Sequence, residues 1–389
     1  MNILYITHCD PRSTDFGSAQ RSHLLWKALQ EKGTVYTVYN VGPQDPNRVF
    51  DAEARIAAVT FLSPNRLVRA CQILFGRYCA PAEWPFRSRS FILGQIPWKD
   101  VHFDCVVTRY LRTAAQAAAW KIAPLYVDID DLPSESFATI RRGRYPWPVG
   151  ALLQKVVTSW QRHVLRKCRG TWIANADQVG EVARICSCRA LPNLAIEPAA
   201  DYDCNGPQKM KLMTVGLMGY EPNYQGVDWF LDTCWPAIHA RFPDMTYAIA
   251  GGGLSDSLRA KWSAMPNVHV LGYVKDLDAL YAESLAVVTP IRSGAGTCIK
   301  VIEAALHGRK ILATPFAVRG LSDDECESLR ICRCEESSTM IPVLEKLAAC
   351  RDRSAVQKCI VDAARRANSY EAFSRQVHLV GRDFILLKK

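Results

Sequence analysis

The stretch that decides the fold is Leu285–Thr314, LAVVTPIRSGAGTCIKVIEAALHGRKILAT. It opens with the apolar, β-branched run Leu285–Thr289, which is typical of a strand buried in a parallel sheet. A loop with two glycines follows, and apolar residues at helical spacing then predict a helix over Ile299–Leu306. Ile311–Thr314 predicts a second strand. Strand, glycine loop, helix and strand in this order indicate a doubly wound α/β domain.

The loop and the first turn of that helix have the features of an anion-binding site. Backbone N–H groups at the start of a helix lack partners and lie at the positive end of the helix dipole. Arg292 and Lys300 add fixed positive charge, and Glu303 follows Lys300 by one helical turn. A nucleoside diphosphate is the simplest ligand that fits, with its ribose beside the carboxylate. The alternative is a solvated helix face on which Lys300 pairs with Glu303.

The pattern P-x-R-S-G-x-G-T-x-x-K-x-x-E-A, followed by G-x-x-[apolar]-x-A-T, resembles the donor site of GT-B glycosyltransferases. The most similar group is the retaining enzymes of glycosyltransferase family 4, also called group 1. The resemblance implies a donor site at Arg292, Gly294, Ala295, Gly296, Thr297, Lys300 and Glu303, in which Arg292 and Lys300 assist catalysis by stabilising the departing diphosphate. Ala295 stands where many members carry a glutamate, so the sugar would lose one carboxylate contact.

Two further strings in the C-terminal half support the resemblance. Gly216-Leu-Met-Gly-Tyr-Glu-Pro-Asn223 is similar to the first strand–loop–helix of the family's donor domain, and Gly216 is the position carried over. Gly272-Tyr-Val-Lys-Asp276 resembles a turn near the nucleotide base, which implies that Tyr273 and Val274 bind there. Each string alone is an ordinary glycine turn after a strand.

Alternating strands and helices are predicted in both halves of the chain. In the N-terminal half the strands are Asn2–Thr7, Thr34–Tyr39, Phe103–Thr108 and Leu125–Ile129, with helices Ala19–Glu31 and Thr113–Lys121. In the C-terminal half the predicted strands are Lys211–Val215, Met245–Ala250 and Val268–Leu271, and a helix is predicted over Val227–Phe242, between the first two of them. Ligands of such parallel sheets gather at the carboxyl ends of the strands.

In the N-terminal half the candidate site residues lie after two strands. The resemblance implies that Gly17, in a glycine loop after the first strand, approaches the diphosphate and the acceptor; a flexible loop with a capping serine is the alternative. Asp128-Ile-Asp-Asp131 gathers three carboxylates at the end of Leu125–Ile129. Asp130 and Asp131 stand where many family 4 enzymes have a histidine, so an acceptor-binding or acid–base role is predicted. Capping of a helix over Leu132–Phe137, or a metal site, are the alternatives.

Length and composition favour two α/β domains. The chain has 389 residues and is 49% hydrophobic, and the resemblance implies the GT-B fold, two doubly wound Rossmann-like domains facing across a cleft. We expect an acceptor-side domain over 1–195, a linker over 196–209, a donor domain over 210–368 and a C-terminal helix over 369–389 that crosses back to the first domain. There is no apolar run of membrane-spanning length, and the N-terminus lacks the features of a signal peptide, so we expect a cytoplasmic protein with reduced cysteines.

The net charge of +10 favours an anionic partner. The segment 141–169 is basic and contains tryptophans, which is typical either of a peripheral membrane contact at the inner face or of a core-facing helix with a solvated basic side. No nucleic-acid-binding motif is present, so no nucleic acid partner is expected.

The predicted function is transfer of a sugar from a UDP- or GDP-linked donor to a hydroxyl of a glycan or lipid-linked acceptor, in cell-surface polysaccharide or glycoconjugate synthesis. The resemblance implies retention, no metal and no permanently bound cofactor. A non-hydrolysing sugar-nucleotide epimerase would share fold and nucleotide. A catalytically silent nucleotide-sugar-binding subunit of a polysaccharide-assembly complex is the second alternative.

Overall fold

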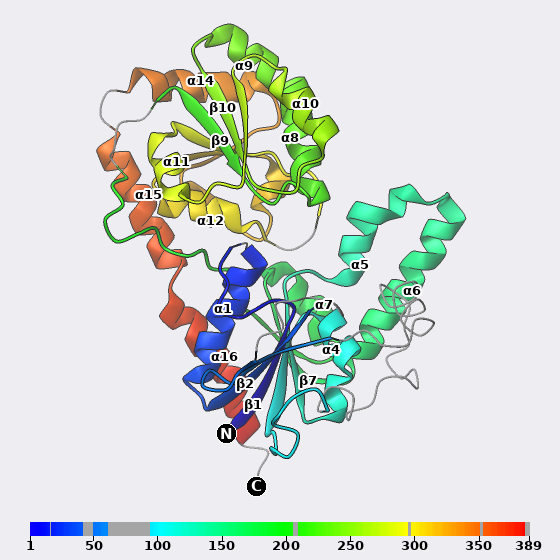
Figure 1. The fold of residues 1–389 in the computed structure, drawn as a ribbon. Coiled ribbons are helices and arrows are strands. Elements are labelled where there is room, and N and C mark those ends of the chain that lie inside the picture. Colours follow the sequence, from blue (N-terminus) through cyan, green and yellow to red (C-terminus); the bar gives the residue numbers. More distant parts are fainter. Residues whose placement is uncertain are drawn as a thin grey trace. The chain divides into compact units, whose positions relative to one another are not determined.

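The computed structural model describes residues 1–15, 17–41, 50–60, 94–204, 209–294, 297–350 and 353–385. The chain divides into two compact units (Figure 1). Unit 1 consists of Met1–Asn193 together with the segment that begins at Tyr370, and unit 2 is Leu194–Ser369. Each unit is built around its own sheet.

The sheet of unit 1 has the described strands in the order β3-β4-β2-β1-β5-β6-β7-β8. All neighbouring strands are parallel except β3 and β4. Their bounds are β1 (Asn2–Thr7), β2 (Thr34–Asn40), β3 (Phe50–Asp51), β4 (Ile56–Val59), β5 (Cys105–Arg109), β6 (Leu125–Ile129), β7 (Cys168–Ile173) and β8 (Ser187–Ala190). The central strands β5 and β6 are buried along their whole length, as their apolar sequences predict.

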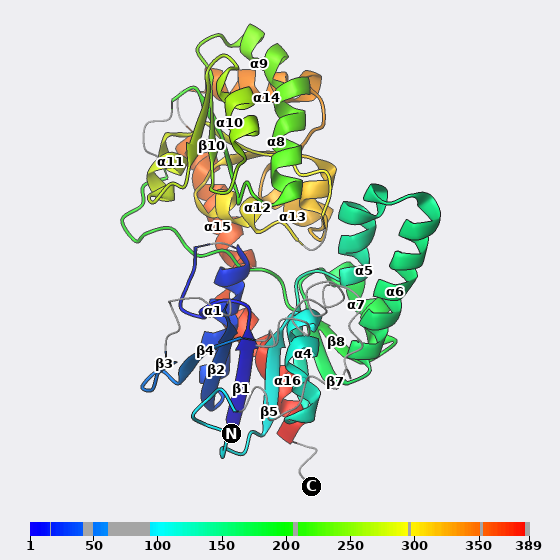
Figure 2. The same cartoon turned by 45° about the vertical axis from the view of Figure 1, so that its right-hand side comes forward.

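Most helices of unit 1 lie against this sheet, whereas the two in residues 133–165 project from it (Figure 2). The helices are α1 (Gly17–Gln30), α4 (Leu111–Ala117), α5 (Pro133–Ser136), α6 (Trp147–Leu165), α7 (Val179–Ala183) and α16 (Tyr370–Ile385). The single helix predicted over Thr113–Lys121 is wrong. Ala118 adopts a left-handed conformation with φ 47°, which ends α4, and a short 3-10 turn, Ala119–Lys121, follows. An alanine run favours a helix but does not show where tertiary packing ends it.

The C-terminal helix α16 belongs to unit 1 and packs against α1. Two of its hydroxyl groups donate hydrogen bonds to the carboxylate of Glu31, from Tyr370 over 2.7 Å and from Ser374 over 2.6 Å. Phe373 is buried between them. The last helix therefore completes the packing of the first one.

Unit 2 contains a parallel sheet in the order β11-β10-β9-β12-β13-β14. The described strands are β9 (Lys211–Val215), β10 (Thr246–Ala250), β11 (Val268–Gly272), β12 (Ala286–Thr289), β13 (Lys310–Ala313) and β14 (Ile331–Arg333). Successive residues of the central strands enter two separate apolar clusters: Met213 and Val287 lie in one, and Leu212 and Val288 in the other. Apolar side chains therefore cover both faces of the sheet, as expected for a doubly wound domain.

The helices of unit 2 are α8 (Glu221–Thr233), α9 (Trp235–Arg241), α10 (Asp256–Ser263), α11 (Leu277–Glu283), α12 (Ile299–Leu306), α13 (Asp323–Ser328), α14 (Ser337–Ala349) and α15 (Ser354–Ala367). The one helix predicted over Val227–Phe242 is instead two. Pro236 has no N–H to continue the first helix, so the chain breaks at Cys234 and restarts at Trp235. The first helix also begins earlier, with Pro222 in its first turn.

Within the described ranges, no helix is long and apolar enough to cross a membrane. No disulfide joins the cysteines of these ranges. The same residues contain no group of three or more His, Cys, Asp or Glu side chains placed to hold a metal ion.

Candidate functional site

In unit 2 the predicted site residues meet where β9, β10 and β12 end and where α8 and α12 begin. Helix α12 starts at Ile299, as the sequence predicts, and its N-cap residue, Cys298, provides no side-chain cap. The N–H groups of the first turn have no partners within the helix and carry its positive dipole end. Gly294 precedes them with φ +119°, a conformation that favours glycine, while Ala295 and Gly296 lie outside the described residues.

Lys300 crosses from α12 to the turn after β9. Its Nζ donates a hydrogen bond to Asn223 Oδ1 over 3.1 Å, and its Cε lies only 2.6 Å from the place where a Cβ on Gly216 would stand. The other end of the Asn223 amide donates to the carbonyl of Leu217 over 2.8 Å. Asn223 was not among the predicted site residues, although it ends the string that begins at Gly216.

The turns after β9 and β10 approach each other through backbone alone. A Cβ on Gly251, whose φ is +136°, would lie 1.6 Å from the carbonyl oxygen of Gly216. Gly253, with φ +84°, would bring its Cβ to 2.9 Å from the backbone nitrogen of Gly219. No side chain fits between these turns, which leaves backbone groups exposed to a ligand beside Lys300.

Arg292 and Lys300 have different partners. The Arg292 guanidinium lies 4.7 Å from the ring centre of Trp229, in the third turn of α8. Among the residues that the structure describes, no carboxylate pairs with Arg292, and the residue is exposed. Its charge is therefore available to an anion, but its position is set by Trp229 rather than by the group around Lys300.

Glu303 lies one turn along α12 from Lys300, and its carboxylate has no hydrogen bond or ion pair with any residue described. Burial raises its pKa to about 7, against the opposing charge of Lys300 and with a further increase from Asp278. A half-buried carboxylate without protein partners, close to a cation, is suited to accept hydrogen bonds from ligand hydroxyls. The ion pair between Glu303 and Lys300 that was the alternative is not present.

The turn after β11 gives its two candidate residues different surroundings. Tyr273 is 72% exposed, whereas Val274 packs against the apolar cluster beneath it. Gly272, with φ +70°, turns the chain between strand and loop. Thr297, the remaining candidate of the donor loop, lies half-buried just before α12.

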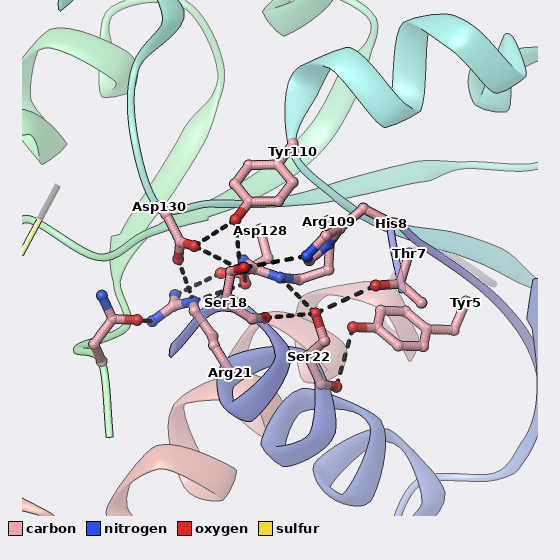
Figure 3. Close-up of polar contacts among 11 residues, drawn as sticks. Tyr5, Thr7, His8, Ser18, Arg21, Ser22, Arg109, Tyr110, Asp128 and Asp130 are labelled. Atoms are coloured by element: carbon pink, nitrogen blue, oxygen red, sulfur yellow. Dashed lines mark hydrogen bonds and ion pairs between the residues drawn. The ribbon is translucent and has the colours of Figure 1, made fainter. Parts of the chain in front are cut away.

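In unit 1 a buried charge cluster lies at the carboxyl ends of β5 and β6 (Figure 3). The guanidinium of Arg21, from α1, pairs with Asp128 Oδ1 over 2.6 Å, and Arg109 pairs with Oδ2 of the same carboxylate. Arg21, Arg109 and Asp128 are fully buried, so their charges must balance within the cluster. Neither arginine was among the predicted site residues, because both are distant in sequence from the aspartates with which they pair.

Asp130 completes this cluster. Its carboxylate accepts hydrogen bonds from Arg109 Nη2 over 2.6 Å and from the Tyr110 hydroxyl over 2.8 Å. Burial alone would raise the pKa of Asp130, but the guanidinium groups of Arg109 and Arg21 outweigh it and hold this pKa at about 2. The carboxylate is ionised at neutral pH. The N-cap residue of α5 is Leu132, which forms no side-chain cap, so neither Asp130 nor Asp131 occupies the capping position.

His8 lies beside this cluster, just after β1. Its Nε2 is 3.2 Å from Ser18 Oγ, and its ring meets that of Tyr110 edge-on at 5.2 Å between centres. Burial and the charge of Arg109 lower the pKa of His8 to about 4, so its imidazole is neutral at physiological pH. Gly17 is the first residue of α1, next to Ser18, and Asp131 lies partly exposed after Asp130.

Comparison with known proteins identifies the fold of this chain. Residues 209–347 match the family model described as Glycosyl transferases group 1, a range that includes Gly216, Lys300 and Glu303. A sucrose-phosphate synthase from Thermosynechococcus elongatus is similar over 99% of both chains, with a TM-score of 0.68 and 16% identity. This chain has the GT-B fold.

Two further GT-B structures are similar over almost the whole chain. HepE of Anabaena, in complex with UDP-glucose, is similar over 98% of this chain and 100% of its own, with a TM-score of 0.61 and 12% identity. A variant of TarM from S. aureus, in complex with UDP among other ligands, is similar over 97% and 99%, with a TM-score of 0.67 and 9% identity. The predicted fold class, two doubly wound domains of the GT-B type, is confirmed.

One curated relative matches in sequence. It is named an uncharacterized 44.6 kDa protein in the cps region of Klebsiella pneumoniae and is 25% identical over 137 residues. The match covers 33% of this chain and 35% of that protein. The chain thus matches about a third of the length of this relative.

Proposed function

We propose that this protein is a glycosyltransferase that moves a sugar from a nucleoside-diphosphate donor to a hydroxyl of a glycan or lipid-linked acceptor. The observation that carries the proposal is Lys300, which lies over Gly216 at the uncapped start of α12, one turn from the unpaired carboxylate of Glu303. The group 1 match over this range supports it. Complexes of HepE with UDP and with UDP-glucose favour a UDP-linked donor over a GDP-linked one.

On the donor side, the residues would act mainly through charge. Lys300 and the first N–H groups of α12 would bind the diphosphate and stabilise the negative charge that grows on it as the sugar leaves. Gly216, Gly294, Ala295, Gly296 and Thr297 would let backbone groups approach the diphosphate. Glu303 would accept hydrogen bonds from the ribose, and Tyr273 and Val274 would contact the base. Arg292 would add a second cation.

On the acceptor side, Asp130 and His8 would act as hydrogen-bond acceptors. An ionised carboxylate with a pKa of about 2 cannot donate a proton at neutral pH, so Asp130 would orient an acceptor hydroxyl rather than act as an acid. The neutral imidazole of His8, which its lowered pKa makes a weak base, would accept a hydrogen bond from such a hydroxyl. Asp131 and Gly17 would line the same end of the sheet. We infer retention, independence from metal and a cytoplasmic role in surface polysaccharide synthesis, as the family resemblance and the cps-region relative suggest.

The experiment that tests this proposal is thermal unfolding with UDP-, GDP-, ADP- and TDP-sugars, with and without EDTA. We expect one nucleotide class to raise the melting temperature regardless of EDTA. Lys300→Ala should abolish the shift, whereas Lys358→Ala, an exposed lysine on α15, should keep it. A shift that survives in Lys300→Ala would refute the donor site.

Product analysis separates the alternatives. A transferase consumes the donor only when an acceptor is present. An epimerase would convert the donor alone, and a silent subunit would bind it without turnover over a broad acceptor panel.

A further inference from the structure

The segment between β6 and β7 forms a helical arm, residues 133–165, that projects from the sheet of unit 1 (Figures 1 and 2). Its two limbs are joined by polar contacts: Gln161 Oε1 accepts from the Ser134 N–H over 2.9 Å, and Gln154 donates to the Ser134 carbonyl over 2.9 Å. Phe137 is buried and stacks on Tyr145 at 6.1 Å between ring centres. The arm is therefore an ordered element with a fixed end.

The end of this arm, residues 143–152, exposes large apolar side chains. Trp147 is 77% exposed and Leu152 is 63% exposed, and Tyr145 and Val149 are also open to solvent. These four are among eleven exposed large apolar residues in the described part of the chain, and they lie within eight consecutive positions. Such clustering is unfavourable in water and marks a surface that contacts another apolar phase.

Positive charge follows directly behind the apolar end. The segment 141–169 has eight Lys and Arg residues and no Asp or Glu, and five of the eight follow Leu152, while Arg144 lies within the apolar end itself. Lys155 and Arg162 are exposed on α6, on the same stripe as Leu152, and Arg166 is exposed directly after the helix. No carboxylate of the described residues pairs with these three side chains. From the helical rise, Lys155 and Arg162 lie about 5 and 15 Å along the axis from Leu152.

We propose that the end of this arm docks on a membrane surface that contains anionic lipids. Trp147 and Leu152 enter the boundary between headgroups and acyl chains, and Lys155 lies at the depth of the headgroup phosphates. Arg162 lies about 10 Å beyond Lys155 along the helix, at the edge of the negative surface potential, which extends about 10 Å into the solution. This contact does not depend on the transferase activity proposed above.

The charge pattern favours a membrane over the other partners. A second copy of the chain would bring two basic stripes together, which costs free energy. A nucleic acid would be attracted by the arginines but offers no apolar phase for Leu152 and Val149. An anionic bilayer complements both the apolar end and the stripe behind it.

The test is sedimentation with vesicles of phosphatidylcholine alone or mixed with phosphatidylglycerol. We expect binding to the mixed vesicles, weakened by salt, and little binding to the neutral ones. The double variant Trp147→Ser/Leu152→Ser should bind at least about tenfold more weakly. Lys155→Gln/Arg162→Gln should lose about fivefold for each charge removed.

The matched control is Val356→Ser/Lys358→Gln, which removes an exposed apolar residue and a lysine from α15 in unit 2. It should bind vesicles like the unmodified protein. Equal binding to neutral vesicles, or unchanged binding by both arm variants, would overturn the proposal. So would a dimer in sedimentation velocity that dissociates in the Trp147→Ser/Leu152→Ser variant while no vesicle is bound.

Donor binding in the same variants separates this inference from the proposed function. The positions changed are exposed, so the variants should melt like the unmodified protein and keep the nucleotide-sugar shift. A lost vesicle contact with an intact donor shift supports docking by the arm. Vesicle binding without any donor shift would leave the arm contact standing and count against the transferase.

Discussion

The substitution Glu303→Gln should stabilise the unliganded protein and weaken donor binding. Burial raises the pKa of Glu303 from 4.5 to about 7. Below pH 4.5 the carboxyl group is protonated in the folded and the unfolded chain and adds nothing to the pH dependence. Above pH 7 the folded protein must hold it ionised in an unfavourable place, at a cost of about 3 kcal/mol for a shift of this size. This is an upper limit, since water that reaches the carboxylate lowers the cost.

Glutamine has nearly the same shape and no charge, so Glu303→Gln removes this cost. The melting temperature should rise by up to roughly 6–12 °C at about pH 8 and change little at about pH 5. Glu283→Gln is the control, because Glu283 on α11 pairs with Lys209 and Lys211, which hold its pKa at about 2. That change should lower stability at pH 8 instead of raising it.

Donor binding should change in the opposite direction. Loss of the charged acceptor for the ribose hydroxyls should weaken the donor about tenfold at pH 8. In the unmodified protein, protonation of Glu303 competes with the donor, so affinity should fall about tenfold between pH 8 and pH 6, and the variant should lack this dependence. A Glu303→Gln protein that is less stable at pH 8 would show that the carboxylate has a structural partner. A variant that binds the donor as well as the unmodified protein would show that the carboxylate has no ligand role.

Three further substitutions test other parts of the two units. Gly251→Ala should destabilise unit 2 by about 2 kcal/mol or more and reduce donor binding, because its Cβ would overlap the Gly216 carbonyl. Chemical denaturation measures the stability and donor titration the binding, and no change in either would contradict the close approach of the two turns. Asp128→Asn should cost about 3–5 kcal/mol of unfolding free energy, since it leaves the buried Arg21 and Arg109 with one carboxylate fewer; a loss below about 1 kcal/mol would mean that the cluster is already hydrated. His8→Ala should slow transfer about 100-fold and leave the donor-induced rise in melting temperature unchanged. Because the pKa of His8 is about 4, the transfer rate should not change with its protonation between about pH 5 and pH 8. An unchanged rate would exclude His8 from the acceptor site.

Elements that depend on local sequence were predictable. β1, β6, β9 and α12 have the predicted bounds, because an apolar run or an apolar stripe between turn residues determines both their type and their ends. The failures are positions where packing or a proline overrides a helical pattern. Ala118 and Pro236 each interrupt a helix that the periodicity would continue.

The site was predictable where its residues follow one another and not where distant segments meet. Lys300 and Glu303 are separated by one helical turn, so sequence spacing alone places them together. Arg21 meets Asp128 across 107 positions, and Asn223 meets Lys300 across 77. No periodicity encodes such contacts, which arise only when the sheet brings the ends of its strands to one edge. His8 was also not predicted, although its position as the first residue after β1 could have identified it as a candidate.

The pairing of α16 with α1 has a consequence for the order of synthesis. When residues 1–193 have left the ribosome, Tyr370, Phe373 and Ser374 have not yet been synthesised. Glu31 therefore still lacks the two hydroxyl groups that bind it in the finished protein. In the sequence, unit 2 stands between the two parts of unit 1. All residues of unit 2 are therefore synthesised before the last residues of unit 1. The usual sequence, in which the N-terminal domain matures first, is therefore reversed in this chain. A premature stop codon near residue 369 would leave unit 2 complete and would leave uncovered the side of α1 that packs against α16.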